Sequence, residues 1–243
     1  PACKKYYQIK SLKNRHYGQR CFIIATGPSL TVTDIEKLEG EITFGVNRLF
    51  SLYQYTDWRP TYYLIMDHKA IPQYQKEGCE VDLDLFCKKE NFISEHVENV
   101  SNIAGKKTVI LPFTYLNHDA FATNWIHKPS PDLFLGLHGT GSVAQACMEI
   151  ASYMGFKEIY LLGTDCDYTN KLHHFDNSSN WFATDIEKSL AINTFMQEGF
   201  QWEKRWMDER NIKVFNATRG GALETFPRVD LDEVLKGNDN KNG

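Results

Sequence analysis

Acidic and aromatic side chains follow a short apolar segment in the second half of the chain. Asp165, Asp167 and Tyr168 come directly after residues 158–162, which are apolar and strand-like. In open α/β sheets, ligands bind beyond the carboxyl ends of the strands, so this cluster marks a candidate site. Asp165 and Asp167 also form a D-x-D pattern, which can hold Mg²⁺ or Mn²⁺ at a diphosphate. The alternative interpretation is that one aspartate caps a loop.

A turn of small residues before the preceding helix offers a place for an anion. Residues 143–154 carry apolar side chains at the three-four spacing of a buried helical face. Thr140, Gly141 and Ser142 stand just before that face, where unpaired backbone N–H groups and the helix dipole favour a negative charge. Gly163, which lies between the strand and Asp165, belongs to the same predicted site.

A second turn follows the first apolar run of the chain, residues 21–25. Gly27, Pro28 and Ser29 end this run at the place where a dinucleotide-binding protein carries its phosphate-binding turn. The later glycines of G-x-G-x-x-G are missing, which argues against ordinary dinucleotide binding. Two interpretations stay open: either a nucleotide phosphate lies near Gly27 and Ser29, or the turn is purely structural.

Single polar residues follow two further strand candidates. Asn47 comes after residues 41–45, and Asp67 comes after residues 61–66. At successive strand ends, these side chains would converge on one crevice, where they suit a base or a ribose hydroxyl. Capping of the following helices is the alternative, since Asn and Asp do this well. Farther along, a glycine-rich turn is expected to place Arg219 near a phosphate.

Two adjacent histidines, His173 and His174, lie in a polar segment that is typical of a mobile lid, about residues 169–185. One imidazole near a substrate hydroxyl could act as a general base, because its ordinary pKa of about 6.5 suits neutral pH. The alternative is that both histidines are solvated loop residues.

Strand and helix patterns alternate along the chain, which predicts a mostly parallel sheet with right-handed crossovers. Residues 70–107 are more polar and are expected to be helical in part, and residues 186–210 form a long helix. We therefore expect one Rossmann-like α/β domain over residues 20–235, with helices on both faces and the lid as an insertion. Residues 1–19 are a helical lead-in, and residues 236–243 are a loose tail. The strand candidates are residues 21–25, 41–45, 61–66, 108–111, 158–162 and 212–215.

Composition narrows the classes of function. The chain of 243 residues is 42% hydrophobic and 13% aromatic, so it can bury a core. Its net charge of −4 argues against a nucleic-acid binder. No apolar run approaches the roughly 20 residues of a membrane span. The six cysteines form no C-x-x-C pair, which favours reduced thiols in a cytoplasmic protein, and peripheral attachment to the inner membrane face is compatible with this.

Several segments are distinctive, and they are TGPSL, FGVNRLF, TYYLIMD, GFKEIYLLGTDCDY, HHF and NATRGGALETFPRV. Together they resemble a bacterial domain family that is named after archaeal 6-hydroxymethylpterin diphosphokinase. The resemblance runs from about residue 20 to residue 229. The same spacing is similar to bacterial lipooligosaccharide sialyltransferases, and flagellin-modifying motility accessory factors share the core.

The similarity to sialyltransferases implies roles for several of these residues. Gly27, Ser29 and Asn47 would contact the nucleotide of a CMP-sugar, as would Ser142 at the helix start. Tyr168 would approach the leaving phosphate, and a lid histidine would deprotonate the acceptor hydroxyl. Such enzymes work without a metal.

The sequence departs from the sialyltransferase pattern at three places. Asp67 stands where those enzymes have Asn, and residues 165–168 replace a tyrosine pair. His173 and His174 lie earlier in the lid than the base of that family. A pterin diphosphokinase would instead bind ATP and Mg²⁺ through an acidic strand end, and the matching place, residues 65–68, holds a single carboxylate.

We therefore predict a sialyltransferase-like glycosyltransferase that moves a CMP-activated nonulosonic sugar, with inversion, to a hydroxyl of a glycan or lipid-linked glycan. His174 is the predicted general base, His173 is the reserve, and Asp165 joins them in the predicted catalytic set. No resident metal is predicted. The alternatives are a Mg²⁺- and ATP-dependent diphosphokinase and a non-catalytic nucleotide-sugar binder. A homo-oligomer is compatible with each of these.

Overall fold

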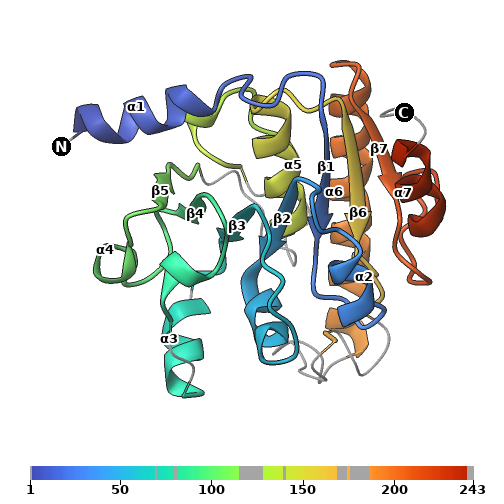
Figure 1. Ribbon diagram of the computed structural model, residues 1–243, viewed down its shortest axis with the longest axis horizontal. Helices are drawn as coiled ribbons and strands as arrows, with labels where there is room; N and C mark the ends of the chain where they lie inside the picture. Colours follow the sequence, from blue (N-terminus) through green and yellow to red (C-terminus); the bar gives the residue numbers. More distant parts are fainter. Residues whose placement is uncertain are drawn as a thin grey trace.

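A single parallel sheet organises the protein (Figure 1). The computed structural model describes residues 2–68, 70–78, 81–114, 128–138, 141–168, 174–175 and 186–239. The sheet has the strand order β5-β4-β3-β2-β1-β6-β7, and every pair of neighbours is parallel. This confirms the predicted Rossmann-like α/β fold. The strands are β1 Arg20–Ile24, β2 Thr43–Val46, β3 Tyr62–Ile65, β4 Asn91–Ser94, β5 Thr108–Leu111, β6 Glu158–Leu162 and β7 Lys213–Asn216.

Helices cover both faces of the sheet (Figure 1). One face packs against α1 Ala2–Leu12, α5 Val143–Tyr153 and α6 Ile186–Asp208. The other face packs against α2 Val32–Glu36, α3 Ala70–Lys76, α4 Val100–Ile103 and α7 Leu231–Asp239, together with the 3-10 helix η1 Asn47–Gln54. Two shorter 3-10 helices, η2 Leu83–Leu85 and η3 Leu133–Leu135, lie in connections.

The central strands are apolar on both faces because both faces are covered. In β1, Cys21 and Ile23 belong to the hydrophobic cluster on the α5 side, whereas Phe22 and Ile24 belong to the cluster on the α2 side. This alternation explains why β1 appears in the sequence as a continuous apolar run without a polar face.

The chain reverses its direction of travel across the sheet at β1. It passes from β1 outward through β2, β3, β4 and β5, and then returns to add β6 and β7 on the other side of β1. In sheets of this kind, the crevice beyond the carboxyl ends of the strands on either side of such a switch point is where ligands bind. The ends of β1 and β6 are therefore the expected centre of a site.

The strand β4 was missed in the sequence, where residues 70–107 were expected to be partly helical. The segment does contain α3 and α4, but Asn91–Ser94 lies between β3 and β5. Its polar first residue is buried because the Asn91 Nδ2 donates to the Leu83 carbonyl at 2.6 Å and Oδ1 accepts from the Cys87 thiol at 3.3 Å. A four-residue strand with Asn and Ser at its ends lacks the apolar run that revealed the other strands.

The two ends of the chain pack more closely on the domain than the sequence indicated. Ile9 and Leu12 of α1 are fully buried in the core. At the other end α7 continues to Asp239, so the predicted loose tail, which begins at residue 236, starts inside a helix. Residues 169–173 and 176–185 lie outside the described residues, so the predicted lid stays a prediction.

The described cysteines and helices bear on two further expectations. Cys21, Cys87, Cys147 and Cys166 are buried free thiols. Burial raises the pKa of Cys87 and of Cys166 to about 12, so both thiols stay protonated at neutral pH. Within the described ranges, every helix is too short or too polar to cross a bilayer.

Removal of the Phe92 ring tests the assignment of β4 to the core. Phe92 is fully buried and stacks on Tyr62 with ring centroids 5.5 Å apart. We expect Phe92→Ala to lower the free energy of unfolding by about 3–5 kcal/mol, measured by urea denaturation, because it leaves a cavity. The matched control is Leu85→Ala in the same segment, where the side chain is 67% exposed and a change below about 0.5 kcal/mol is expected. Equal effects of the two substitutions would contradict the burial of β4.

Candidate functional site

A cavity of about 250 Å³ lies at the carboxyl ends of β1, β2, β3 and β6, beside the N-terminus of α5. It therefore occupies the crevice at the switch point of the sheet. Most of the predicted site residues line it, although they come from six separate segments of the chain. They are Gly27, Pro28, Asn47, Asp67, Gly141, Ser142, Gly163, Asp165, Asp167, Tyr168 and His174.

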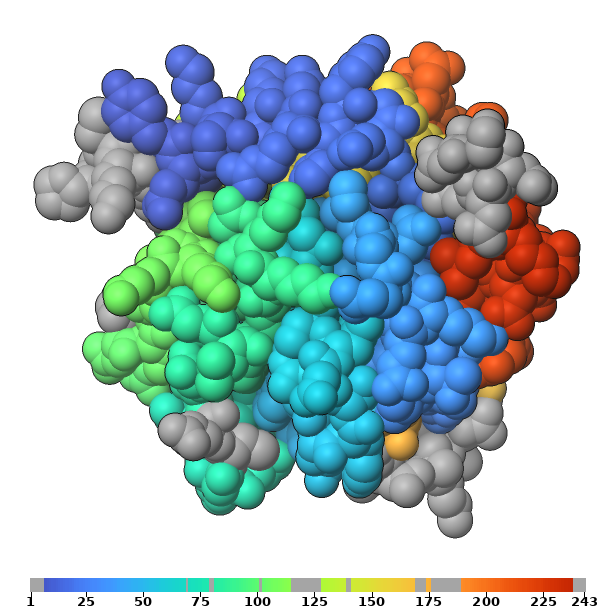
Figure 2. All heavy atoms as spheres, viewed as in Figure 1, coloured from blue at the N-terminus to red at the C-terminus, as the bar shows by residue number. Residues whose placement is uncertain are grey.

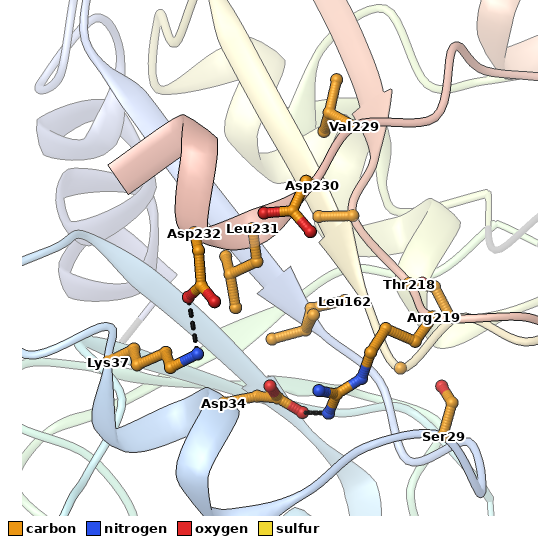
Figure 3. Close-up of a pocket in the computed structure, with 12 residues that line it drawn as sticks. Ser29, Asp34, Lys37, Leu162, Thr218, Arg219, Val229, Asp230, Leu231 and Asp232 are labelled. Atoms are coloured by element: carbon orange, nitrogen blue, oxygen red, sulfur yellow. Dashed lines mark hydrogen bonds and ion pairs between the residues drawn. The ribbon is translucent and has the colours of Figure 1, made fainter. Parts of the chain in front are cut away.

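Three predicted site residues are not found there. Thr140 and His173 lie outside the described residues. Ser29 lines a second, smaller hollow between α2 and the start of α7 (Figure 3). Its backbone N–H and hydroxyl donate to the Asp165 carboxylate at 3.3 Å and 2.8 Å. Ser29 therefore contacts a residue of the cavity wall without lining the cavity itself.

The turns after β1 and β6 touch each other, and this contact explains the need for Gly27. The Gly27 N–H donates to the Gly163 carbonyl at 2.8 Å. A Cβ atom at Gly27 would lie 1.9 Å from Oδ2 of Asp165 and 2.5 Å from the Gly163 oxygen. No side chain fits in that space, so glycine is required by close approach of the two turns.

Asp165 is a buried carboxyl group that holds this contact together. Desolvation raises its pKa, the two hydrogen bonds from Ser29 oppose the shift, and the charge of Asp167 adds to it. Both carboxylate oxygens of Asp165 accept hydrogen bonds from Ser29, which fixes the orientation of the carboxylate. Among the described residues, no three His, Cys, Asp or Glu side chains come together as a metal site would require.

The side chain of Asn47 is only partly explained by the fold. Its φ of 42° lies in the left-handed region, which Asn tolerates better than most residues. Its carbonyl accepts from the Tyr63 hydroxyl at 2.7 Å, but its shielded Oδ1 has no hydrogen-bond partner among the described residues. Val46, rather than Asn47, is the N-cap of η1 and makes no side-chain cap. The capping interpretation of Asn47 is therefore not supported.

Ser142 begins α5 and faces the cavity. Its hydroxyl accepts from the Ala144 N–H at 3.2 Å, and its own N–H donates to the Gln145 side chain at 3.0 Å. This capping box fixes the direction in which the helix dipole points. Gly141 has a φ of 125°, and a Cβ there would lie 2.5 Å from the Phe195 ring. The turn before α5 is thus packed tightly against α6.

Tyr168 and His174 supply a hydroxyl group and an imidazole to the cavity. Desolvation raises the pKa of Tyr168 well above its ordinary value, and the nearby Cys166 and Asp165 add to the shift, so the hydroxyl keeps its proton. The Nδ1 atom of His174 lies 2.9 Å from the Thr26 hydroxyl. The Thr26 carbonyl accepts from the Phe175 N–H at 2.9 Å, which attaches this pair of residues to the end of β1.

Sequence reasoning missed Thr26 and Thr164, which both line the cavity. The Thr164 side-chain oxygen is shielded from solvent and has no hydrogen-bond partner in the described part of the chain. Each threonine adjoins a glycine that the sequence did single out, Gly27 and Gly163. Their position directly after a buried strand is the signal that could have identified them.

The glycine-rich loop after β7 supports the cavity from outside, and Arg219 does not reach it. The Ala222 N–H donates to the Asp165 carbonyl at 2.7 Å. The Arg228 guanidinium donates to the carbonyls of Gly220 at 2.6 Å and Gly221 at 3.1 Å. Arg219 was expected near a phosphate, but it forms an ion pair with Asp34 in the smaller hollow instead (Figure 3).

Solved structures with a similar fold include glycosyltransferases. The MAf glycosyltransferase from Magnetospirillum magneticum AMB-1 aligns with a TM-score of 0.57 and 15% identity, over 94% of this chain and 38% of that one. This chain thus spans about two fifths of the length of the MAf enzyme. The sialyltransferase CstII from Campylobacter jejuni, in complex with cytidine-5'-monophosphate, aligns with a TM-score of 0.45 and 14% identity, over 88% of this chain and 85% of that one.

The likeness to the MAf enzyme shows the fold, which is glycosyltransferase-like. No curated protein matches the sequence. The sequence profile described as 6-hydroxymethylpterin diphosphokinase MptE-like matches residues 2–171, and the chain therefore belongs to the MptE-like family.

Proposed function

We propose that this protein is a glycosyltransferase that moves a CMP-activated nonulosonic sugar to a hydroxyl of a glycan acceptor, with inversion. One observation carries the proposal. Asn47 and Thr164, whose buried side-chain oxygens have no partner among the described residues, line the same cavity as the start of α5, Tyr168 and His174. Buried polar atoms without partners are uncommon in folded proteins, and two of the seven such atoms among the described residues belong to side chains at this cavity, which supports a polar ligand there.

The nucleotide end of the donor would lie between the β1 turn, Asn47 and α5. The Asn47 Oδ1 atom is an acceptor, so it suits an amino group of a base or a ribose hydroxyl. The phosphate would face the N-terminus of α5, where the helix dipole and the Ser142 hydroxyl stabilise negative charge. Gly27 and Gly141 let the β1 turn pack against Asp165 and the α5 turn pack against Phe195, so both glycines shape the cavity wall at these positions.

Charge on the cavity wall favours a donor with a single phosphodiester. Among the described residues, none that lines the cavity is Lys or Arg, whereas Asp67, Asp165 and Asp167 are all present. A nucleoside triphosphate would bring several negative charges toward these carboxylates. A CMP-activated nonulosonic sugar carries one charge on its phosphodiester and one on the sugar carboxylate, fewer than a triphosphate, and its phosphodiester would lie at the start of α5.

The reaction would proceed as one displacement at the anomeric carbon. The acceptor oxygen forms a bond to that carbon, the bond from the carbon to the phosphate oxygen breaks, and the acceptor proton passes to Nε2 of His174. Thr26 contacts Nδ1, and in this role it orients the ring. The Tyr168 hydroxyl, which keeps its proton, donates to the departing phosphate of CMP.

A second candidate is a Mg²⁺- and ATP-dependent diphosphokinase. Two observations favour it: membership of the MptE-like family, and the presence of Asp67 and Asp167 on the same cavity wall. Carboxylate oxygens are suitable ligands for Mg²⁺ that is bound to a nucleotide. The two proposals differ in the nucleotide and in the metal that they require, so a single binding experiment separates them.

Binding of nucleotides to wild type and to Asn47→Gly distinguishes these functions. Glycine keeps the left-handed backbone and removes the carboxamide. In a thermal-shift panel of CMP, CDP, UDP, GDP and ATP, with and without Mg²⁺, CMP at about a hundredfold excess over its Kd should raise the Tm of wild type by about 5–10 °C. Asn47→Gly should weaken CMP binding about tenfold because one acceptor is lost.

The matched control is Asn211→Gly, since Asn211 is exposed and has a φ of 53°. It makes the same chemical change at a left-handed position far from the cavity and should leave CMP binding unchanged. A shift with ATP and Mg²⁺ but none with CMP would favour the diphosphokinase and reject the transferase.

His174→Ala tests the general base. We expect turnover to fall about 10²–10⁴-fold, while the affinity for CMP changes less than about twofold, because the base acts on the acceptor proton. Donor hydrolysis and transfer, measured by release of CMP, provide the readout. His68→Ala is the control, since His68 is exposed and paired with Glu98 at 3.2 Å outside the cavity wall. Full turnover by the His174 variant would remove the assignment.

Asp165→Asn tests the structural role of the buried carboxyl group. Because its pKa is raised in the folded protein, the native state binds this proton more tightly than the unfolded chain. This contribution to stability is present at low pH and is lost as the pH rises from about 3.9 through the raised pKa. The stability of the variant relative to wild type should therefore increase with pH in urea denaturation curves. A pH-independent difference would show that Asp165 titrates normally.

A further inference from the structure

A larger cavity, of about 410 Å³, lies at the opposite end of the sheet. Its walls come from α1, from the residues that precede β4 and from those that precede β5. Figure 1 shows α1 at the end where the strands begin, and α2 and α3 at the end where they finish. In Figure 2 the N-terminal segment lies along the top of the region that contains β4 and β5. The cavity is therefore separate from the candidate functional site.

Positive charge dominates the wall of this cavity. Arg15, Lys89, Lys106 and Lys107 line it, and Glu90 is the single acidic residue among the described lining residues. Glu90 accepts from the Arg15 guanidinium at 2.6 Å, which neutralises one of the four cations. The three lysines form no ion pair with a lining residue, although the Asp84 carboxylate accepts from the backbone N–H groups of Lys106 and Lys107.

Two of the cations are held in place by the fold. Arg15 donates to the Ser11 carbonyl at 3.3 Å as well as to Glu90. The Lys107 ammonium donates to the Asp84 carbonyl at 3.0 Å. Lys89 and Lys106 are exposed and have no side-chain hydrogen bond or ion pair within the part of the chain that the structure describes. The wall thus combines fixed cations with two lysines that are available to a ligand.

A buried histidine lies close enough to this wall for the wall charges to affect its pKa. His16 is buried, and its ring contacts Gln19 Oε1 at 2.6 Å and the Tyr62 hydroxyl at 2.7 Å. Its pKa is lowered mainly by desolvation, and the Gln19 hydrogen bond opposes the shift. The charges of Lys89 and Arg15 lower the pKa further, and the charge of Glu90 raises it. His16 is therefore a built-in reporter of charge in the cavity.

We propose that this cavity binds a phosphate-bearing ligand, held by Lys89, Lys106 and Lys107 beside Arg15. Ammonium and guanidinium groups make strong charge-assisted hydrogen bonds to phosphate oxygens. The phosphate belongs either to a free phosphorylated compound or to a lipid headgroup. This inference does not depend on the nucleotide site.

Inorganic pyrophosphate is the soluble probe, and His16 provides the readout. CMP is kept in excess so that a nucleotide site is occupied beforehand. Titration of the His16 imidazole by NMR should show a pKa that rises when pyrophosphate binds, since the anion offsets the charges of Lys89 and Arg15. The same experiment on Lys89→Gln/Lys106→Gln should show binding about tenfold weaker.

The control variant is Lys88→Gln/Lys236→Gln, which removes the same total charge. Lys88 pairs with Glu39 and Lys236 pairs with Glu233, both at 2.8 Å and outside the cavity wall. This variant should bind pyrophosphate like wild type. Failure of CMP to bind would count against the proposed transferase but would leave the His16 readout intact, so the two proposals fail separately.

Vesicles distinguish the two sources of phosphate. Cosedimentation with phosphatidylglycerol vesicles, but not with phosphatidylcholine vesicles, would identify a headgroup if Lys89→Gln/Lys106→Gln abolishes it. Binding of pyrophosphate without cosedimentation would identify a soluble ligand. If neither probe binds, or if both variants bind like wild type, the proposal is overturned.

Discussion

The contact between the turns after β1 and β6 is the constraint on which the candidate site depends. The Asp165 carboxylate accepts two hydrogen bonds from Ser29, and Gly27 packs directly against both Asp165 and Gly163. The loop after β7 is a third segment in this contact, because the Ala222 N–H donates to the Asp165 carbonyl. One buried carboxyl group therefore connects the carboxyl ends of the strands on either side of the switch point.

The polar groups around the cavity fall into two kinds. The side chains of Asp165, Ser29 and Ser142 make hydrogen bonds within the protein, so their arrangement is explained by architecture. Asn47 and Thr164 instead present shielded oxygens that no other described residue satisfies. A buried polar atom without a partner is destabilising by about 1–3 kcal/mol. The hydrogen bonds of the first group therefore explain the shape of the wall, whereas the side-chain oxygens of Asn47 and Thr164 are left unexplained by the described residues.

Much of the fold could be predicted because six of the seven strands are apolar runs bounded by turns. The strand β4 could not be predicted from the sequence, because the burial of Asn91 depends on hydrogen bonds with Leu83 and Cys87 that form only in the folded chain. The position of Asn47 in the cavity followed from the rule that parallel strands deliver their carboxyl ends to one edge. The position of Ser29 did not follow, because nothing in a GPS turn indicates which side chain faces the cavity. The hydrogen bonds of Ser29 to Asp165, which is distant in the sequence, turn its hydroxyl toward that carboxylate.

An all-parallel sheet makes the two ends of this molecule chemically different. Strands of four to five residues, at about 3.3 Å per residue, span roughly 15 Å between the end of the sheet with the lysine-lined cavity and the end with the candidate functional site. If the lysine-lined end binds an anionic membrane surface, the cavity at the carboxyl ends of the strands opens on the side away from that membrane. A glycan anchored in the same membrane would then have to extend past the full length of the strands to reach that cavity. In that orientation, the parallel direction of the strands sets a minimum length for a membrane-anchored acceptor.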